Sequence, residues 1–68
     1  MIQISVNNSL HDIKADACIR DLVEQLGYSG EALLGVALNQ IFIPKKDWKT
    51  THLKAQDQVD LLKPVSGG

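Results

Sequence analysis

The segment "ACIRDLVEQLG", residues 17–27, is the one part of this 68-residue chain with a clear helical periodicity. Four apolar side chains recur in it at positions i, i+3, i+4 and i+7, and they are Ile19, Leu22, Val23 and Leu26. This spacing predicts an amphipathic helix with one apolar stripe. Gly27 is suited to end it, because glycine adopts the left-handed conformation after a helix without strain. Either Asp16 or Cys18 fits the N-cap.

On the N-terminal side of the helix, the sequence predicts a β-hairpin. Residues 2–6 read "IQISV" and alternate apolar with polar side chains, which is typical of a half-buried strand. Asn7 and Asn8 follow, and asparagine tolerates the left-handed conformation that a two-residue hairpin turn requires. We therefore expect a second strand at residues 10–14 to fold back beside the first.

On the C-terminal side, three further strands are predicted. "GVALN" at residues 35–39 alternates again, and the turn formed by Asn39 and Gln40 leads into "IFIP" at residues 41–44. The proline ends that strand or confines it to a sheet edge, because it has no N–H to donate. The last strand, "QVDLLK" at residues 58–63, turns Asp60 and Leu62 away from the core.

The order strand, strand, helix, strand, strand, strand predicts an α+β fold. A single helix can cover one face of a sheet, so the opposite face is expected to stay open. The residues expected to face the helix are Ile2, Ile4, Val6, Val36, Leu38, Val59 and Leu61.

Composition and charge favour a small folded domain without a nucleic-acid or membrane partner. The chain is 44% hydrophobic and 22% charged, with a formal charge of -1, which gives no field to attract polyanions. The lone Cys18 cannot form an internal disulfide, and no secretory signal or bilayer-length apolar span is visible, so we expect a cytoplasmic protein. His11 and His52 show no zinc-like spacing with Cys18, so no metal site is expected.

The second half of the chain, "GVALNQIFIPKKDWKTTHLKAQDQVDLLKPVSGG", resembles the sulfur-carrier proteins of thiamine biosynthesis, the ThiS family of ubiquitin-like β-grasp domains. The residues that carry the resemblance are Ala37-Leu38-Asn39, Ile43-Pro44, Trp48, Thr51, Leu53, Asp57, Val59 and Gly67-Gly68. The resemblance implies a β-grasp domain at residues 1–63, with a mixed sheet of four to five strands and one main helix on one face. Residues 64–68 would then form a flexible C-terminal Gly-Gly tail.

Two positions depart from the family pattern. The family usually has glycine where this chain has Gln56, in the turn before the last strand, and a left-handed residue there is strained when it is glutamine. The family also tends to place threonine where this chain has Cys18, which predicts a weaker capping contact at the helix start.

The function implied by the resemblance centres on the C-terminus. An ATP-dependent, E1-like adenylating enzyme would activate the carboxylate of Gly68, which a sulfur-donor protein would convert to a thiocarboxylate, and the sulfur would pass to thiazole synthase. Gly67 and Ser66 would enter the narrow channel of the partner with Gly68, and the two glycines have no Cβ to collide with its walls. The chain would be a protein substrate and not an enzyme, with no catalytic residues and no bound cofactor, since ATP and the sulfide source are used by the activating partner.

The strand alternation also predicts a docking surface. Phe42 and Leu62 point away from the helix-covered face, alongside Ala37. Val65 is also assigned to partner docking. Exposed apolar side chains grouped in this way often mark a partner site. We expect this patch to dock first on the adenylating enzyme and later on the synthase.

Other readings of the same residues stay open at this level. The small subunit of molybdopterin synthase also ends in Gly-Gly and resembles this chain at "PVSGG", although chain length and Trp48 favour the thiamine pathway. The tail by itself fits other ubiquitin-like sulfur carriers, such as those of tRNA thiolation, equally well. A ubiquitin-like interaction domain that is never activated is the alternative from another class. Trp48 is interpreted as a lid over the core and Cys18 as a structural residue at the helix start.

Overall fold

The computed structural model describes residues 1–64 of the chain. Its elements, in chain order, are β1 (Ile2–Val6), β2 (Ser9–Ile13), α1 (Ile19–Gln25), the 3-10 turn η1 (Gly30–Ala32), β3 (Gly35–Leu38), β4 (Ile41–Ile43), the 3-10 turn η2 (Lys45–Asp47) and β5 (Gln58–Leu62). The predicted order of strands and helix is confirmed. β2 begins and ends one residue earlier than predicted, because the two-residue turn leads directly into Ser9.

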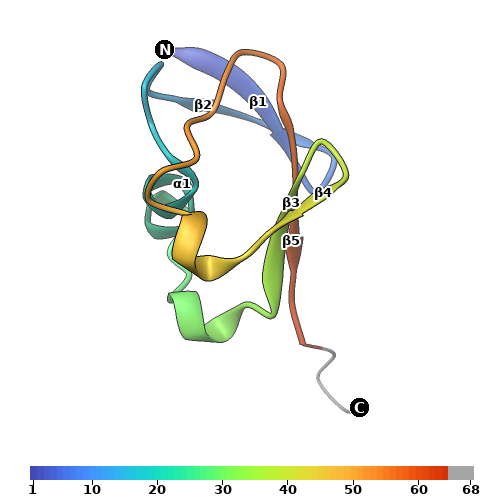
Figure 1. Cartoon of the computed structure of the whole chain (residues 1–68). Helices are drawn as coiled ribbons and strands as arrows, with labels where there is room; N and C mark the ends of the chain where they lie inside the picture. The colour runs from blue at the N-terminus through green and yellow to red at the C-terminus, as the bar shows by residue number, and fades with distance from the viewer. Residues whose placement is uncertain (65–68) are drawn as a thin grey trace.

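The five strands form one mixed sheet in the order β2-β1-β5-β3-β4. β1 and β5 are parallel, and every other neighbouring pair is antiparallel. Figure 1 shows α1, η1 and η2 together on one side of this sheet. The last strand in sequence therefore lies in the middle of the sheet, and the chain leaves the domain from there toward its C-terminus.

The core lies between α1 and the covered face of the sheet. Its fully buried side chains come from three of the four residues of the predicted helix stripe, from the inward positions of four strands and from the loop before β5, and they are Ile4, Ile13, Ile19, Leu22, Val23, Val36, Leu53 and Val59. Trp48 is also buried, and its indole Nε1 donates a hydrogen bond to the carbonyl oxygen of Ile43 at 2.9 Å. The interpretation of Trp48 as a packing residue is therefore confirmed. Ile41, at the far edge of β4, stays exposed.

The turns follow the local rules that the sequence indicated. Both hairpin turns have positive φ at their two central residues, with 49° and 69° at Asn7 and Asn8 and 51° and 70° at Asn39 and Gln40. Such left-handed pairs suit the right-handed twist of the strands that they join. The turn before β5 departs from the rule that glycine takes such positions, because its Gln56 holds a φ of 69°.

Cys18 is the N-cap of α1, which decides between the two candidates, Asp16 and Cys18. The Cys18 backbone N–H donates a hydrogen bond to Asp21 Oδ2 at 3.1 Å, so the carboxylate caps the first turn from inside the helix. This hydrogen bond lowers the pKa of the Asp21 carboxyl below its ordinary value of 3.8. Asp16 instead accepts a hydrogen bond at its backbone oxygen from the His52 ring, at 2.9 Å.

Candidate docking face at the root of the C-terminal segment

The side of the sheet away from α1 carries no helix, and we call it the open face. Strand alternation and cross-strand register together assign its residues, because side chains paired across neighbouring strands share a face. These residues are Gln3, Ser5, Leu10, Asp12, Gly35, Ala37, Phe42, Gln58, Asp60 and Leu62. The prediction that this face stays open is confirmed for the residues that the structure describes.

Three of the four predicted docking residues come together on the open face. Phe42 pairs with Ala37 across β4 and β3, and Leu62 pairs with Gly35 across β5 and β3. Phe42 is 58% exposed and Leu62 is 42% exposed, which are large fractions for apolar side chains in a sheet. The fourth predicted residue, Val65, lies outside the described residues.

Gly35 is the member of this patch that the sequence did not reveal. A Cβ atom at Gly35 would lie 2.5 Å from Cε1 of Phe42, so the aromatic ring lies directly over this glycine. Glycine inside a strand often marks a place where another group approaches the backbone closely. That signal was present in "GVALN", but it does not say which group approaches.

The end of β5 is held by two contacts. The Leu34 backbone N–H donates a hydrogen bond to the carbonyl oxygen of Leu62 at 2.6 Å. The Nζ atom of Lys63 lies 4.9 Å from the centre of the Tyr28 ring, within range of a cation–π interaction. These contacts hold the root of the C-terminal segment as far as Lys63. The predicted reactive and channel residues, Gly68, Gly67 and Ser66, lie outside the described residues, so the division into a domain at 1–63 and a tail at 64–68 stays a prediction.

The other places considered for a site are Cys18, the possible metal ligands and one surface hollow. Cys18 is buried, with its backbone engaged in a bridge to His52. Within residues 1–64, no three His, Cys, Asp or Glu side chains are grouped so that they could hold a metal ion. A hollow of about 350 Å³, open to solvent on the helix side, is lined by Arg20, Ser29, Glu31, Lys45 and Trp48. Its lining mixes both signs of charge.

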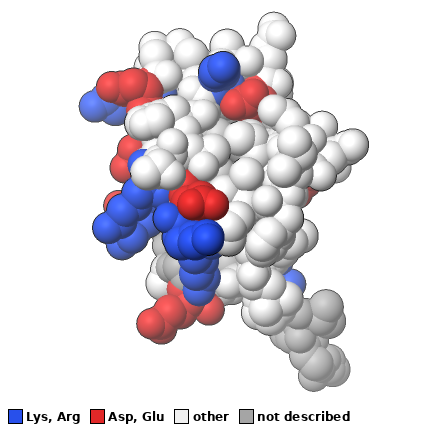
Figure 2. Space-filling view, viewed as in Figure 1, with Lys and Arg blue, Asp and Glu red and all other residues white. Residues whose placement is uncertain are grey.

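Charge is distributed unevenly over the molecule. Figure 2 shows Lys, Arg, Asp and Glu side chains gathered over α1 and η2 and at the top, whereas the side over β3 and β4 is mostly uncharged. None of the helices in residues 1–64 has both the length and the hydropathy needed to span a bilayer. The apolar patch is thus a local feature of the sheet, beside the strand that leads to the C-terminus.

A single helix on one face of a five-stranded mixed sheet, with the last strand in its centre, defines a ubiquitin-like β-grasp domain. The fold is similar to the crystal structure of the thiamine biosynthesis protein ThiS from Geobacter metallireducens, with a TM-score of 0.81, 21% identity, and coverage of 98% of this chain and 100% of that chain. It is also similar to the NMR solution structure of a thiamine biosynthesis protein from the same organism, with a TM-score of 0.77, 20% identity, and coverage of 98% and 88%. At these identities the likeness establishes the fold.

The sequence itself establishes the family. The model of the ThiS family matches residues 4–68, and the chain belongs to this family. No curated protein sequence matches the chain significantly. The resemblance seen in the second half of the sequence is confirmed, and family membership supports a sulfur-carrier role in thiamine biosynthesis.

Proposed function

We propose that this chain carries sulfur as a thiocarboxylate on Gly68 and delivers it to thiazole synthase. The observation that carries the proposal is the family match, which extends through Gly67 and Gly68. The open face adds support, because its apolar patch lies on the strands that hold the root of the C-terminal segment. A carrier needs such a surface, since immobilising each residue of its tail on binding costs about 1–2 kcal/mol.

The proposed chemistry has two activation steps and one transfer. A carboxylate oxygen of Gly68 attacks the α-phosphorus of ATP and releases pyrophosphate, which gives an acyl-adenylate. Hydrosulfide sulfur, supplied by a sulfur-donor protein, then attacks the acyl carbon, and the C–O bond to AMP breaks. In the last step the carbon–sulfur bond of the thiocarboxylate breaks as its sulfur passes to the acceptor on the synthase, an oxygen atom from water or from that acceptor bonds to the same carbon, and Gly68 returns to a carboxylate. A free α-carboxyl has a pKa of about 3.3–3.7, so it is already the nucleophilic anion at neutral pH.

The catalytic groups in this scheme belong to the partners. Charge that develops on the phosphate and on the acyl oxygen needs fixed cations and hydrogen-bond donors. The open face of the carrier offers the amides of Gln3 and Gln58, two carboxylates and an apolar patch, which suit recognition rather than catalysis. The carrier is therefore a substrate in this proposal, ATP is used by the adenylating enzyme, and the reactions take place in the cytoplasm.

The experiment that tests the proposal is intact-mass measurement. The purified chain, with Gly68 as its carboxyl terminus, is incubated with ATP, sulfide and the adenylating enzyme from the same organism. A mass gain equal to replacement of one oxygen by one sulfur is expected, and the chain that lacks Gly68 should show no gain. An unchanged mass together with tight binding would instead indicate an interaction domain that is never activated.

The sulfur acceptor is tested separately. The thiocarboxylate form is mixed with thiazole synthase and its other substrates, and the loss of the sulfur mass from the carrier is followed. Release that depends on the synthase supports the thiamine pathway. Release only with molybdopterin synthase large subunit would move the chain to the other sulfur-carrier pathway.

A further inference from the structure

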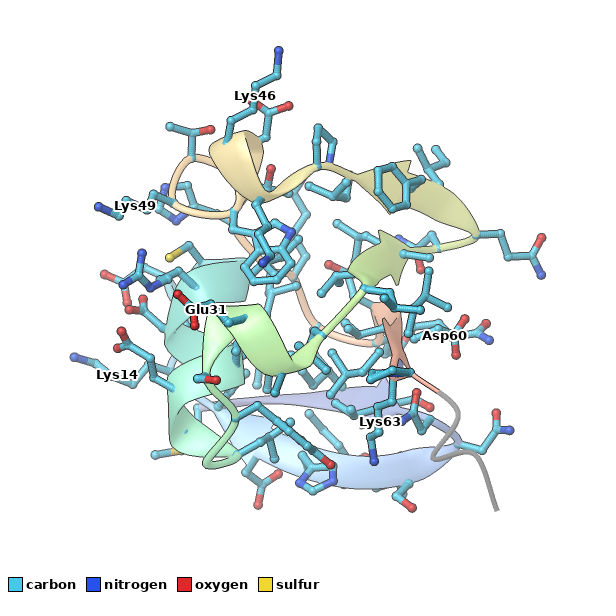
Figure 3. The ribbon with its side chains drawn as sticks, turned by 90° about the horizontal axis from the view of Figure 1, so that it is seen from below. Lys14, Glu31, Lys46, Lys49, Asp60 and Lys63 are labelled. Carbon is cyan, nitrogen blue, oxygen red and sulfur yellow. The ribbon has the colours of Figure 1, made fainter. Side chains whose placement is uncertain are left out.

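Asp60 is a carboxylate at the centre of the open face. Val59 and Leu61, its neighbours in β5, are buried on the helix side, so Asp60 points to the opposite side. Figure 3 shows Asp60 on the side of the sheet away from α1, whereas Lys14 and Lys49 lie on the helix side. Within residues 1–64, its carboxylate has no hydrogen bond or ion pair.

Asp60 shares one row of the sheet with the predicted docking residues. Phe42 pairs with Ala37, and Ala37 pairs with Asp60. Neighbouring strands are about 4.8 Å apart, so the backbones of Phe42 and Asp60 are about 10 Å apart, with only a methyl group between them. A partner that covers Phe42 and Ala37 therefore also covers Asp60 or lies against it.

The open face has no cation of its own to pair with Asp60. The seven Lys and Arg residues of the chain all lie outside the open face, and they are Lys14, Arg20, Lys45, Lys46, Lys49, Lys54 and Lys63. The nearest of them along the chain, Lys63, has its Nζ on the Tyr28 ring. The open face carries two carboxylates, Asp12 and Asp60, and hence a local charge of -2 against -1 for the whole chain.

Docking of an apolar surface on Phe42 would remove water from an unpaired carboxylate. Burying a charge without a partner is strongly unfavourable, whereas a complementary cation turns the same group into a determinant of specificity. An apolar partner surface without a cation would therefore be rejected by this face.

We propose that Asp60 selects the partner: the adenylating enzyme docks on the open face with an apolar surface that presents one Arg or Lys side chain to the Asp60 carboxylate. This inference rests on the proposed function for the identity of the partner. Phe42, Ala37 and Leu62 supply the apolar contact, and Asp60 supplies the charge that distinguishes this enzyme from proteins with a purely apolar docking surface.

The test uses the full chain with Asp60→Asn and Asp60→Lys, and Asp12→Asn and Asp12→Lys as matched controls. Asp12 lies on the same face but in β2, at the opposite edge of the sheet from Phe42. Three quantities are measured: the dissociation constant for the adenylating enzyme by calorimetry, and the KM and kcat of carrier-dependent ATP–pyrophosphate exchange. Unfolding curves of all variants establish that each is folded.

Asp60→Asn is expected to raise the dissociation constant and KM about tenfold and Asp60→Lys about a hundredfold, as for the loss and the reversal of a charge pair at an interface. The kcat at saturating carrier should stay within about twofold of wild type, since the tail chemistry is untouched. The salt dependence of binding should become flatter in Asp60→Asn, and changing the facing Arg or Lys of the enzyme to Glu should restore binding of Asp60→Lys.

The outcomes separate this inference from the proposed function. If Asp60→Lys binds like wild type and like the Asp12 variants, the role of Asp60 is overturned while the carrier function stands. If wild type binds the enzyme but supports no exchange, the proposed adenylation is wrong, and the binding constants still decide on Asp60. If wild type neither binds nor reacts, both are overturned.

Discussion

The two faces of the sheet are built from the same strands but differ in how far their apolar side chains are buried. On the covered face, inward side chains such as Val36 and Val59 are fully buried against α1. On the open face, Phe42 and Leu62 keep about half of their surface in water. Apolar area that stays exposed contributes little to folding, and we attribute the grouping of Phe42 and Leu62 to the proposed docking. A change on one face should therefore move stability, and a change on the other should move affinity.

The largest effect is expected from Leu22→Ala on the covered face. Leu22 is fully buried, and such truncations cost about 2–5 kcal/mol. A domain of this size has a total stability of about 3–10 kcal/mol, so much of the chain should unfold. Urea unfolding followed by the fluorescence of the buried Trp48 measures the loss. Leu62→Ala is the control on the open face, and a destabilisation as large as that of Leu22→Ala would break the distinction between the faces.

Phe42→Asp is the corresponding change on the open face. The ring is more than half exposed, so the variant should fold with a stability within about 1 kcal/mol of wild type. Its KM in the exchange reaction should rise at least about thirtyfold, as for loss of an aromatic binding hot spot. Ile41→Asp, in the same strand but on its other side, is the control and should bind normally. A folded Phe42→Asp variant that is adenylated at the normal rate would remove the patch from the proposal.

Gly35→Ala gives a finer test, because it moves the Phe42 ring without removing it. The new Cβ would meet Phe42 Cε1 at 2.5 Å, and the ring has to rotate away. Returning the Phe42 ring to the rotamer that it has in wild type, which the partner is proposed to bind, costs about 0.5–1.5 kcal/mol. The affinity for the adenylating enzyme should therefore fall about two- to tenfold. In a Phe42→Ala background the same change should have no effect on affinity. Additive effects of the two substitutions would show that Gly35 acts on docking independently of Phe42.

Local patterns in the sequence predicted much of this architecture. The stripe from Ile19 to Leu26, the Asn7-Asn8 turn and the outward direction of Phe42 and Leu62 all depend on residues close in the chain. The parallel pairing of β1 with β5 depends on contacts between the two ends of the chain, and strand patterns alone do not specify it. The family resemblance supplied that part of the fold.

The site was predictable to the same extent. Alternation placed Phe42, Ala37 and Leu62 on one face, because it fixes direction. It does not fix what lies beside a side chain across the sheet. The ring over Gly35 and the contact of Lys63 with Tyr28 therefore came from the structure, since both join residues from different elements.

Gln56→Gly should raise stability without any change in docking. The left-handed φ of 69° at Gln56 costs a non-glycine residue about 1–2 kcal/mol, while glycine adds about 0.5–1 kcal/mol of unfolded-state entropy. The net gain should be about 0.5–1 kcal/mol in the free energy of unfolding. Ala55→Gly in the same turn, where φ is not positive, should instead lower stability. Equal effects at the two positions would contradict the strain at Gln56.

The smallest effect is expected from Asp21→Asn, which should change the pH dependence of stability and leave docking on the open face unchanged. The pKa of Asp21 is lowered in the folded state, chiefly by the hydrogen bond from the Cys18 N–H. Its contribution to stability is therefore present above the ordinary value of 3.8 and is lost as the pH falls through the lowered pKa of the folded state. Asp21→Asn should therefore be less stable than wild type at pH 7, and the difference should shrink at pH 3. Chemical unfolding at both pH values measures this difference.

Asp16→Asn is the matched control for Asp21→Asn. It changes the neighbouring carboxylate, which caps no helix N–H within residues 1–64, and should leave the pH dependence of wild type unchanged. Because Asp21 caps α1 and takes no part in the open face, Asp21→Asn should also bind the adenylating enzyme like wild type at pH 7. A difference in stability that persists at pH 3, or a loss of binding at pH 7, would show that Asp21 acts by another route than its charge at the helix start.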